Sequence, residues 1–135
     1  MHKFYIGPTD NTPEIHLSPD ENIFFIRGIS SPEDVRSLYY PVNEWFKIYI
    51  DKIIEEKGTI FSPDNPLKLQ IDLEYFNSSS AKFLFDIIME IKRASLAEIP
   101  VIIEWYYDSA DHDLRSAGSD IALLAEMEFT YIQKK

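Results

Sequence analysis

The chain has 135 residues, of which 45% are hydrophobic, and it carries a formal net charge of −10 and no cysteine. This length and composition favour one domain over residues 1–135, and the missing cysteine excludes thiolate catalysis, disulfides and thiolate zinc sites. The negative charge argues against nucleic acid or an anionic membrane as partners. The chain has no membrane-spanning apolar run and no signal peptide at its start, so we expect a cytoplasmic protein.

The first third of the chain predicts mainly strands. Short segments at residues 4–6, 14–17 and 23–26 are separated by Pro- and Asp-containing turns, which is typical of a β-hairpin or a meander. Residues 31–34, Ser-Pro-Glu-Asp, combine a capping hydroxyl, a proline and two acids, and predict one short helical turn. Pro41 is expected to begin a longer helix over residues 42–57.

The middle of the chain predicts a strand, a helix and a second strand. Apolar side chains alternate with polar ones over residues 67–76 from Leu67 to Tyr75, as in a strand with one buried face. The next helix runs to residue 96, with a core stripe widened at its edges by further apolar residues that include Met89 and Leu96. Residues 99–107 are nearly all apolar, as in a central strand, with Trp105 inside and Tyr106 nearer the surface. The long crossover implies parallel pairing.

The end of the chain predicts a helix over about residues 111–125 and an edge strand within residues 127–133. The helical pattern places four side chains inward: Leu114, Ala117, Ile121 and Leu124. The whole pattern predicts an α/β fold, a two-layer sandwich whose mixed sheet has antiparallel strands at its start and a parallel βαβ unit. We expect the helices mainly on one face of the sheet.

A candidate functional site lies where strands end and helices begin. Three consecutive hydroxyls, Ser78, Ser79 and Ser80, follow Asn77 at the expected start of a helix. The unpaired N–H groups of a helix start can hold side-chain oxygens, a phosphate or a phosphorylated serine. In open α/β sheets the carboxyl ends of the strands are the usual functional position, so we expect Ser78 to lie near Asp108. Helix capping by these hydroxyls is the simpler alternative.

Negative charge gathers near the end of the chain. Residues 104–128 hold seven acidic residues and one basic residue, Arg115. This region could steer a basic partner, or it could be a solvated loop and helix surface. Asp108, Asp111 and Asp113 lack the spacing of an EF-hand, so we interpret them as acids at a helix start and expect no metal site.

Five segments in this chain resemble the SiaC-type regulatory phosphoproteins, small bacterial proteins whose fold is similar to the STAS-like anti-sigma-factor antagonist domains. The segments keep the family's order and cover nearly the whole chain: TPEI at 12–15, GISSPED at 28–34, YP at 40–41 followed by Trp45, EYFNSSSAK at 74–82, and WYYD at 105–108 followed by DHD at 111–113 and Gly118. The resemblance implies a single regulatory domain of this type over residues 1–135.

The resemblance also implies a signalling switch. In such systems a protein kinase phosphorylates the protein, a PP2C-type phosphatase removes the phosphate, and the unmodified form binds and activates a diguanylate cyclase that controls biofilm formation through c-di-GMP. The family's phosphoacceptor threonine falls on Ser78, with Ser79 and Ser80 as alternates, and Ala81 replaces a usual serine. We expect these partner-binding residues: Asn77, Lys82, Tyr106, Asp108, Asp111 and Asp113.

Motifs of catalysis and of cofactor binding are absent from the sequence. The three histidines, His2, His16 and His112, are scattered, and no zinc-protease, serine-hydrolase, phosphate-loop or dinucleotide motif occurs. We therefore expect no catalytic residue and no cofactor. The main alternative to a switch is a constitutive adaptor or an oligomer subunit that is never phosphorylated. It predicts that Ser78→Asp and Ser78→Ala leave partner binding unchanged.

Overall fold

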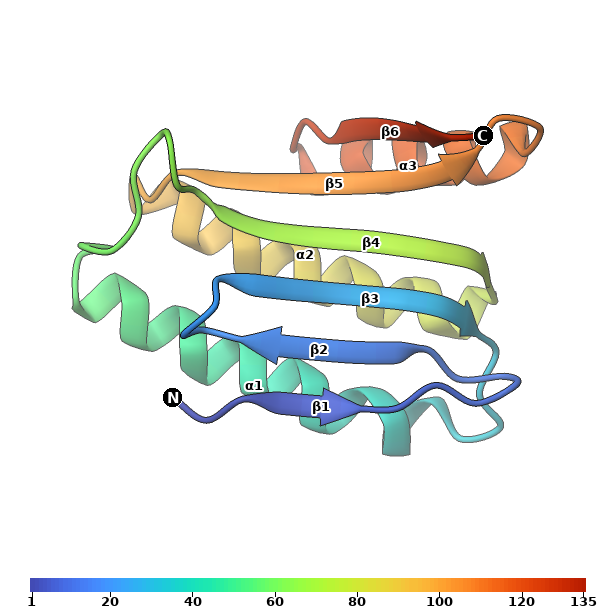
Figure 1. The fold of residues 1–135 in the computed structure, drawn as a ribbon, viewed down its shortest axis with the longest axis horizontal. Coiled ribbons are helices and arrows are strands. Elements are labelled where there is room, and N and C mark those ends of the chain that lie inside the picture. Colours follow the sequence, from blue (N-terminus) through green and yellow to red (C-terminus); the bar gives the residue numbers. More distant parts are fainter.

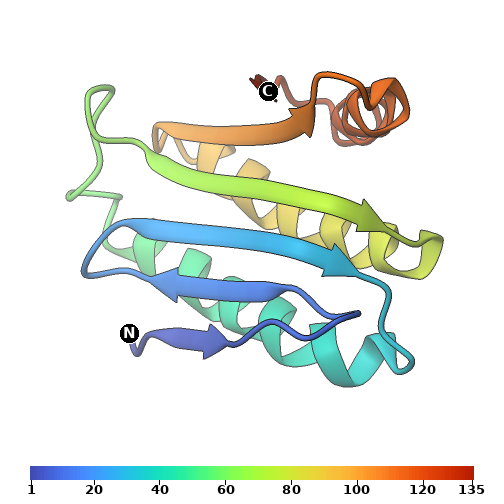
Figure 2. The same ribbon diagram turned by 45° about the vertical axis from the view of Figure 1, so that its right-hand side comes forward.

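The computed structural model describes residues 1–135 and contains one six-stranded sheet with three helices packed on one face (Figures 1 and 2). The strands lie across the sheet in chain order: β1 (Phe4–Ile6), β2 (Glu14–Ser18), β3 (Ile23–Ser30), β4 (Leu67–Phe76), β5 (Val101–Asp108) and β6 (Thr130–Lys134). Pairing is antiparallel from β1 to β3 and parallel from β3 to β6. The predicted fold class is confirmed. None of the three helices combines the length and the apolar character of a membrane span.

Helix α1 (Val35–Glu55) begins earlier than the sequence predicted. The Asp34 carboxylate caps it by accepting from the backbone N–H of Ser37 at 3.1 Å, and Pro41 lies inside the helix. The predictions of a separate helical turn at residues 31–34 and of a helix that begins at Pro41 were therefore wrong. Tyr39 and Val42, on either side of the proline, are fully buried, so core packing holds the helix together across the missing N–H.

The long strand β4 contains a bulge that the alternating pattern does not show. Gly28 of β3 pairs with Leu73, but the next residue, Ile29, pairs with Tyr75, so Glu74 is an extra residue in β4. The bulge turns Phe76 toward the core and leaves Tyr75 54% exposed. The predicted inward position of Tyr75 was therefore wrong, although the alternation up to Leu73 is confirmed.

Helices α2 (Ser78–Leu96) and α3 (His112–Ala125) pack over β4 and β5. The predicted core stripe of α2 is buried and comprises Leu84, Ile87, Ile88 and Ile91. The apolar residues Met89, Leu96 and Leu124, which we expected to face the core, are exposed instead.

Trp105 explains which residues of α3 face inward. Its side chain is 1% exposed beneath α3, as predicted, while Tyr106 on the next position is half-buried on the opposite face of the sheet. A Cβ atom on Gly118 would lie 2.5 Å from the indole Nε1, so only glycine fits there. The face of α3 that contains Gly118 and Ala122 therefore packs against the indole, and Leu124 faces outward as a result.

Candidate functional site

The candidate site lies at the carboxyl ends of β4 and β5, where helices α2 and α3 begin. Asn77 follows β4 and caps α2, and Asp111 follows β5 and caps α3. One open pocket is lined by Asn77 and Ser78 on one side and by Asp111 and Asp113 on the other. Asp108 lines the adjoining pocket, which shares Glu74 and both of these aspartates. The two helix starts are therefore neighbours, as predicted.

The three consecutive serines have different surroundings. The Asn77 side-chain oxygen accepts hydrogen bonds from the Ser80 backbone N–H at 2.9 Å and from the Ser79 hydroxyl at 3.0 Å. The Ser80 hydroxyl is fully buried and donates to the Ser30 carbonyl at 3.1 Å. Ser78 is exposed, and its hydroxyl makes no hydrogen bond within the chain. Of the three hydroxyls, that of Ser78 is therefore the one that is both accessible and free.

A chain of buried hydroxyls lies beneath the start of α2. The Ser30 hydroxyl donates to the Ser80 hydroxyl at 2.8 Å and lies 2.6 Å from the Tyr39 hydroxyl. Burial raises the pKa of Tyr39, so its hydroxyl keeps its proton and can act as a donor to Ser30. These contacts join the end of β3, helix α1 and helix α2. Ser80 is therefore a structural residue in this position.

The Ser80→Ala variant should lose stability because the buried Ser30 hydroxyl would lose its acceptor. We expect a decrease of about 1–3 kcal/mol in the free energy of unfolding, the usual cost of an unsatisfied buried polar group. Ser79→Ala, which removes an exposed hydroxyl, should change it by less than about 0.5 kcal/mol. Urea unfolding of both variants measures the difference. Equal effects would show that the buried hydroxyl chain contributes nothing.

The acidic residues at the site act mainly as helix caps and turn formers. Asp111 accepts from the Leu114 backbone N–H at 2.9 Å, and Asp108 accepts from the Ala110 backbone N–H at 2.9 Å. The structure contains no cluster of three or more His, Asp or Glu residues arranged to hold a metal ion. The pocket beside Ser78 is lined by Glu74, Asp111 and Asp113 and by no Lys or Arg. A negative charge added at Ser78 would therefore find no cation within this pocket.

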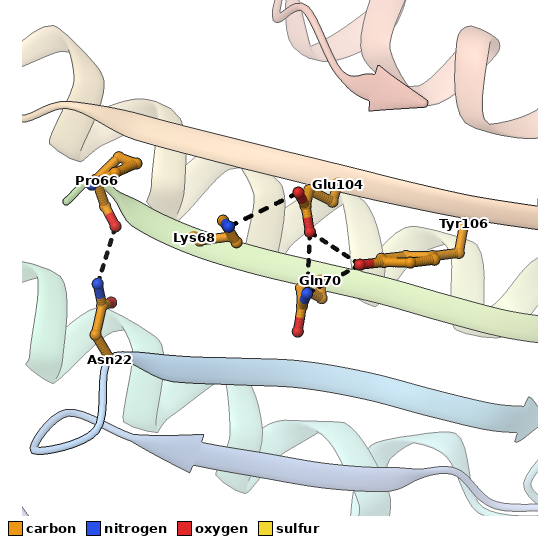
Figure 3. A network of polar contacts seen from close by, with 6 residues as sticks. All are labelled: Asn22, Pro66, Lys68, Gln70, Glu104 and Tyr106. Atoms are coloured by element: carbon orange, nitrogen blue, oxygen red, sulfur yellow. Dashed lines mark hydrogen bonds and ion pairs between the residues drawn. The ribbon is translucent and has the colours of Figure 1, made fainter. Parts of the chain in front are cut away.

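Two of the predicted partner-binding residues lie away from this pocket. Tyr106 is on the open face of the sheet, where its hydroxyl donates to Glu104 at 3.0 Å and accepts from Gln70 at 2.9 Å (Figure 3). Burial and the bond to Glu104 raise the pKa of Tyr106. Lys82 lies on α2 and pairs with Asp86 at 2.6 Å. The two adjoining pockets thus bring together Asn77, Ser78 and the aspartates, and neither Tyr106 nor Lys82 lines them.

Sequence reasoning missed Ser30, Tyr39 and Glu74. Ser30 ends β3, which runs parallel to β4, so its position at the same edge as Asn77 could have been inferred from the topology. Tyr39 could not be placed, because the helix was expected to begin after it. Glu74 reaches the pocket through the bulge in β4, which leaves no clear mark in the sequence.

Comparison with known proteins gives a consistent result. The model of the SiaC family of regulatory phosphoproteins matches residues 6–134. An uncharacterised protein of Pseudomonas aeruginosa strain UCBPP-PA14 is 28% identical over 108 residues, which are 80% of this chain and 78% of that protein.

Solved structures with the same fold come from P. aeruginosa. The crystal structure of apo-SiaC matches with a TM-score of 0.73 and 24% identity over 100% of both chains. The crystal structure of the diguanylate cyclase SiaD in complex with its activator SiaC matches with a TM-score of 0.78 and 23% identity, over 96% of this chain and 97% of the matched chain. At these identities, the similarity shows a common fold.

Proposed function

Since this chain belongs to the SiaC family of regulatory phosphoproteins, we propose that it is a non-enzymatic signalling switch whose unphosphorylated form binds and activates a diguanylate cyclase. The observation that carries this proposal is the family match over residues 6–134. The complex of P. aeruginosa SiaD with its activator SiaC supports the choice of a diguanylate cyclase as partner, and hence a role in c-di-GMP signalling and biofilm regulation.

Ser78 is the proposed phosphoacceptor. Its exposed and unbonded hydroxyl supports this choice, because a kinase must reach the oxygen and no internal hydrogen bond has to break. Ser80 is a poor acceptor since its hydroxyl is fully buried, and Ser79 is bonded to the cap residue Asn77. A protein kinase and a PP2C-type phosphatase would add and remove the phosphate, which carries a charge of about −1.5 to −2 at neutral pH.

A constitutive adaptor or oligomer subunit is the second candidate. The capping geometry at Asn77 and Ser80 favours it, since this geometry stabilises the start of α2 whether or not Ser78 is ever modified. The two candidates differ in one respect: an adaptor binds its partner equally well whatever charge stands at position 78.

The activation step can be tested with purified proteins. We expect the unmodified chain to bind a diguanylate cyclase from the same organism and to raise its rate of c-di-GMP synthesis by about fivefold or more, in the range of typical coupling between sites. Calorimetry measures binding, and chromatography of the product measures the rate. Binding without a change in rate would favour the adaptor, and neither binding nor activation by any cyclase of that organism would contradict the proposed function.

A further inference from the structure

Strand β6 forms one edge of the sheet, and its outer side has no partner within the chain (Figure 1). The Lys134 carbonyl accepts from the Ser109 N–H at 3.1 Å, so the backbone groups of Lys134 face β5. Because successive residues of a strand direct these groups to opposite sides, those of Tyr131 and Gln133 face outward. The N–H and C=O groups of these two residues are therefore available to another extended segment.

The two edges of the sheet differ in how well they are protected from such pairing. Strand β1 at the opposite edge has only three residues, and very short edge strands discourage pairing with another chain. Strand β6 has five residues. A lysine on an edge strand also discourages pairing, but the charge of Lys134 is balanced by Asp72, whose carboxylate lies 2.6 Å from the ammonium group. β6 is therefore the edge that can accept a strand.

An apolar groove of about 360 Å³ lies beside this edge, between α3 and the residues that lead into β6. Leu123 on its wall is 78% exposed, and the other apolar residues of the lining include Met127, Phe129 and Tyr131. The one charged residue in the lining is Glu128, which makes no ion pair within the chain. A strand added to β6 would thus meet apolar surface and one free carboxylate.

The charges along the edge favour a second copy of this chain as the partner. Residues 126–135 hold two acids near their start, Glu126 and Glu128, and two bases at their end, Lys134 and Lys135, so the segment is neutral in a chain of net charge −10. Two such segments attract each other when they are antiparallel, because the basic end of each meets the acidic end of the other. Parallel pairing would bring like charges together.

We propose that two copies of this chain form a twofold-symmetric dimer through antiparallel pairing of their β6 strands. With Ile132 on the symmetry axis, Tyr131 of each copy lies opposite Gln133 of the other, and the outward backbone groups of both residues are hydrogen-bonded. The two sheets then continue into each other, with the helices of both copies on the same face. This inference does not depend on the proposed function.

The same register also fills the groove. Lys135 of one copy would lie opposite Phe129 of the other, where its aliphatic stem covers apolar surface and its ammonium group reaches Glu128. Symmetry makes each of these contacts occur in both halves of the dimer. The pocket beside Ser78 contains no residue of this groove or of β6, so the dimer contact would not use the candidate site.

The mass of the full-length chain in solution tests the dimer. Sedimentation equilibrium should give twice the mass of one chain, which is 15.8 kDa, at high protein concentration and a monomer on dilution. Gln133→Pro removes an outward N–H and no bond to β5, so we expect it to weaken dimerisation at least about tenfold. Its melting temperature, measured at a dilution where both proteins are monomers, should equal that of the wild type.

A charge swap tests the antiparallel register. Glu128→Lys and Lys135→Glu should each weaken dimerisation about threefold or more, because each places like charges opposite one another, and the double variant should restore it. Glu55→Lys is the matched control for Glu128→Lys. It makes the same change in net charge at an exposed residue of α1, outside the groove, and it should dimerise at least as well as the wild type.

The opposite results would overturn the proposal. A wild type that stays monomeric at all concentrations would show that copies of this chain do not pair. If Gln133→Pro then weakened binding to a diguanylate cyclase, the edge would accept a strand of that partner instead. If the wild type dimerises but Gln133→Pro dimerises equally well, the copies meet through another surface. If the double charge variant fails to restore dimerisation, the antiparallel register is wrong.

Discussion

A Ser78→Asp variant is expected to bind the diguanylate cyclase at least tenfold more weakly than the wild type, whereas Ser78→Ala should bind normally. The added carboxylate would stand in a pocket that already holds Glu74, Asp111 and Asp113 and no cation. The surface around the start of α2 would therefore become more negative, and a partner that approaches it with carboxylates or apolar groups would be repelled or left with an unpaired charge.

Lys82 provides a second reason to expect weaker binding by the Ser78→Asp variant. In the unmodified chain Lys82 pairs with Asp86 at 2.6 Å. An anion at position 78 lies one turn before Lys82 and competes with Asp86 for its ammonium group. Asp86 would then become an unpaired carboxylate on the surface of α2. If this route operates, the loss of binding caused by Ser78→Asp should be smaller in a Lys82→Gln background.

The controls separate a switch from a fold defect. An acid in the first turn of a helix is stabilising, so Ser78→Asp should not lower the melting temperature. Ser79→Asp adds the same charge one residue further along, where the side chain points in another direction, and it should weaken binding less. Equal affinities for Ser78→Asp, Ser78→Ala and the wild type would favour the constitutive adaptor.

The Trp105→Ala variant should have the largest effect on stability. The indole is 1% exposed, donates its N–H to the Leu114 carbonyl at 3.1 Å and stacks on Phe129 with ring centroids 5.8 Å apart. It also meets Phe76 at the end of β4 edge to face. Removing such a side chain leaves a cavity and a carbonyl without its donor, and we expect a loss of about 3–5 kcal/mol in the free energy of unfolding.

Tyr75→Ala is the matched control for Trp105→Ala. Both are large aromatic residues near the same edge of the sheet, but the bulge leaves Tyr75 54% exposed. Its replacement should cost less than about 1 kcal/mol. Chemical unfolding followed by far-UV circular dichroism measures both. A large loss for Tyr75→Ala would mean that this residue faces the core and that the bulge is wrongly placed.

The fold could largely be predicted because, over most of the chain, the spacing of the apolar residues and the positions of the turn residues indicate the same helices and strands. The structure confirms the alternation of buried and less buried side chains from Leu67 to Leu73 and the buried apolar stripe of α2. The failures occur where a long-range contact overrides the local pattern. Burial of the core side chains Tyr39 and Val42 keeps α1 helical on both sides of Pro41. The Trp105 indole can pack only against the face of α3 that contains Gly118.

Of the candidate site, only the closeness of Ser78 to the aspartates after β5 could be predicted from the sequence. The rule that parallel strands end at one edge brings Ser78 close to the aspartates of the β5–α3 connection, and the structure confirms this neighbourhood. The same rule cannot separate the three serines, since exposure depends on Ser30 and Tyr39, which are distant in the sequence. Tyr106 is two residues before Asp108, but its side chain lies on the open face of the sheet, and Lys82, one turn after Ser78 on α2, is not among the residues that line the pocket.

The order of the strands has a consequence for how this protein is made. Because each strand pairs with the one before it in the chain, no strand has to be inserted between two that are already joined. The sheet can therefore grow from β1 outward as the chain leaves the ribosome. The pocket beside Ser78 needs residues of α3, so it can close only after strands β1 to β5 have been made.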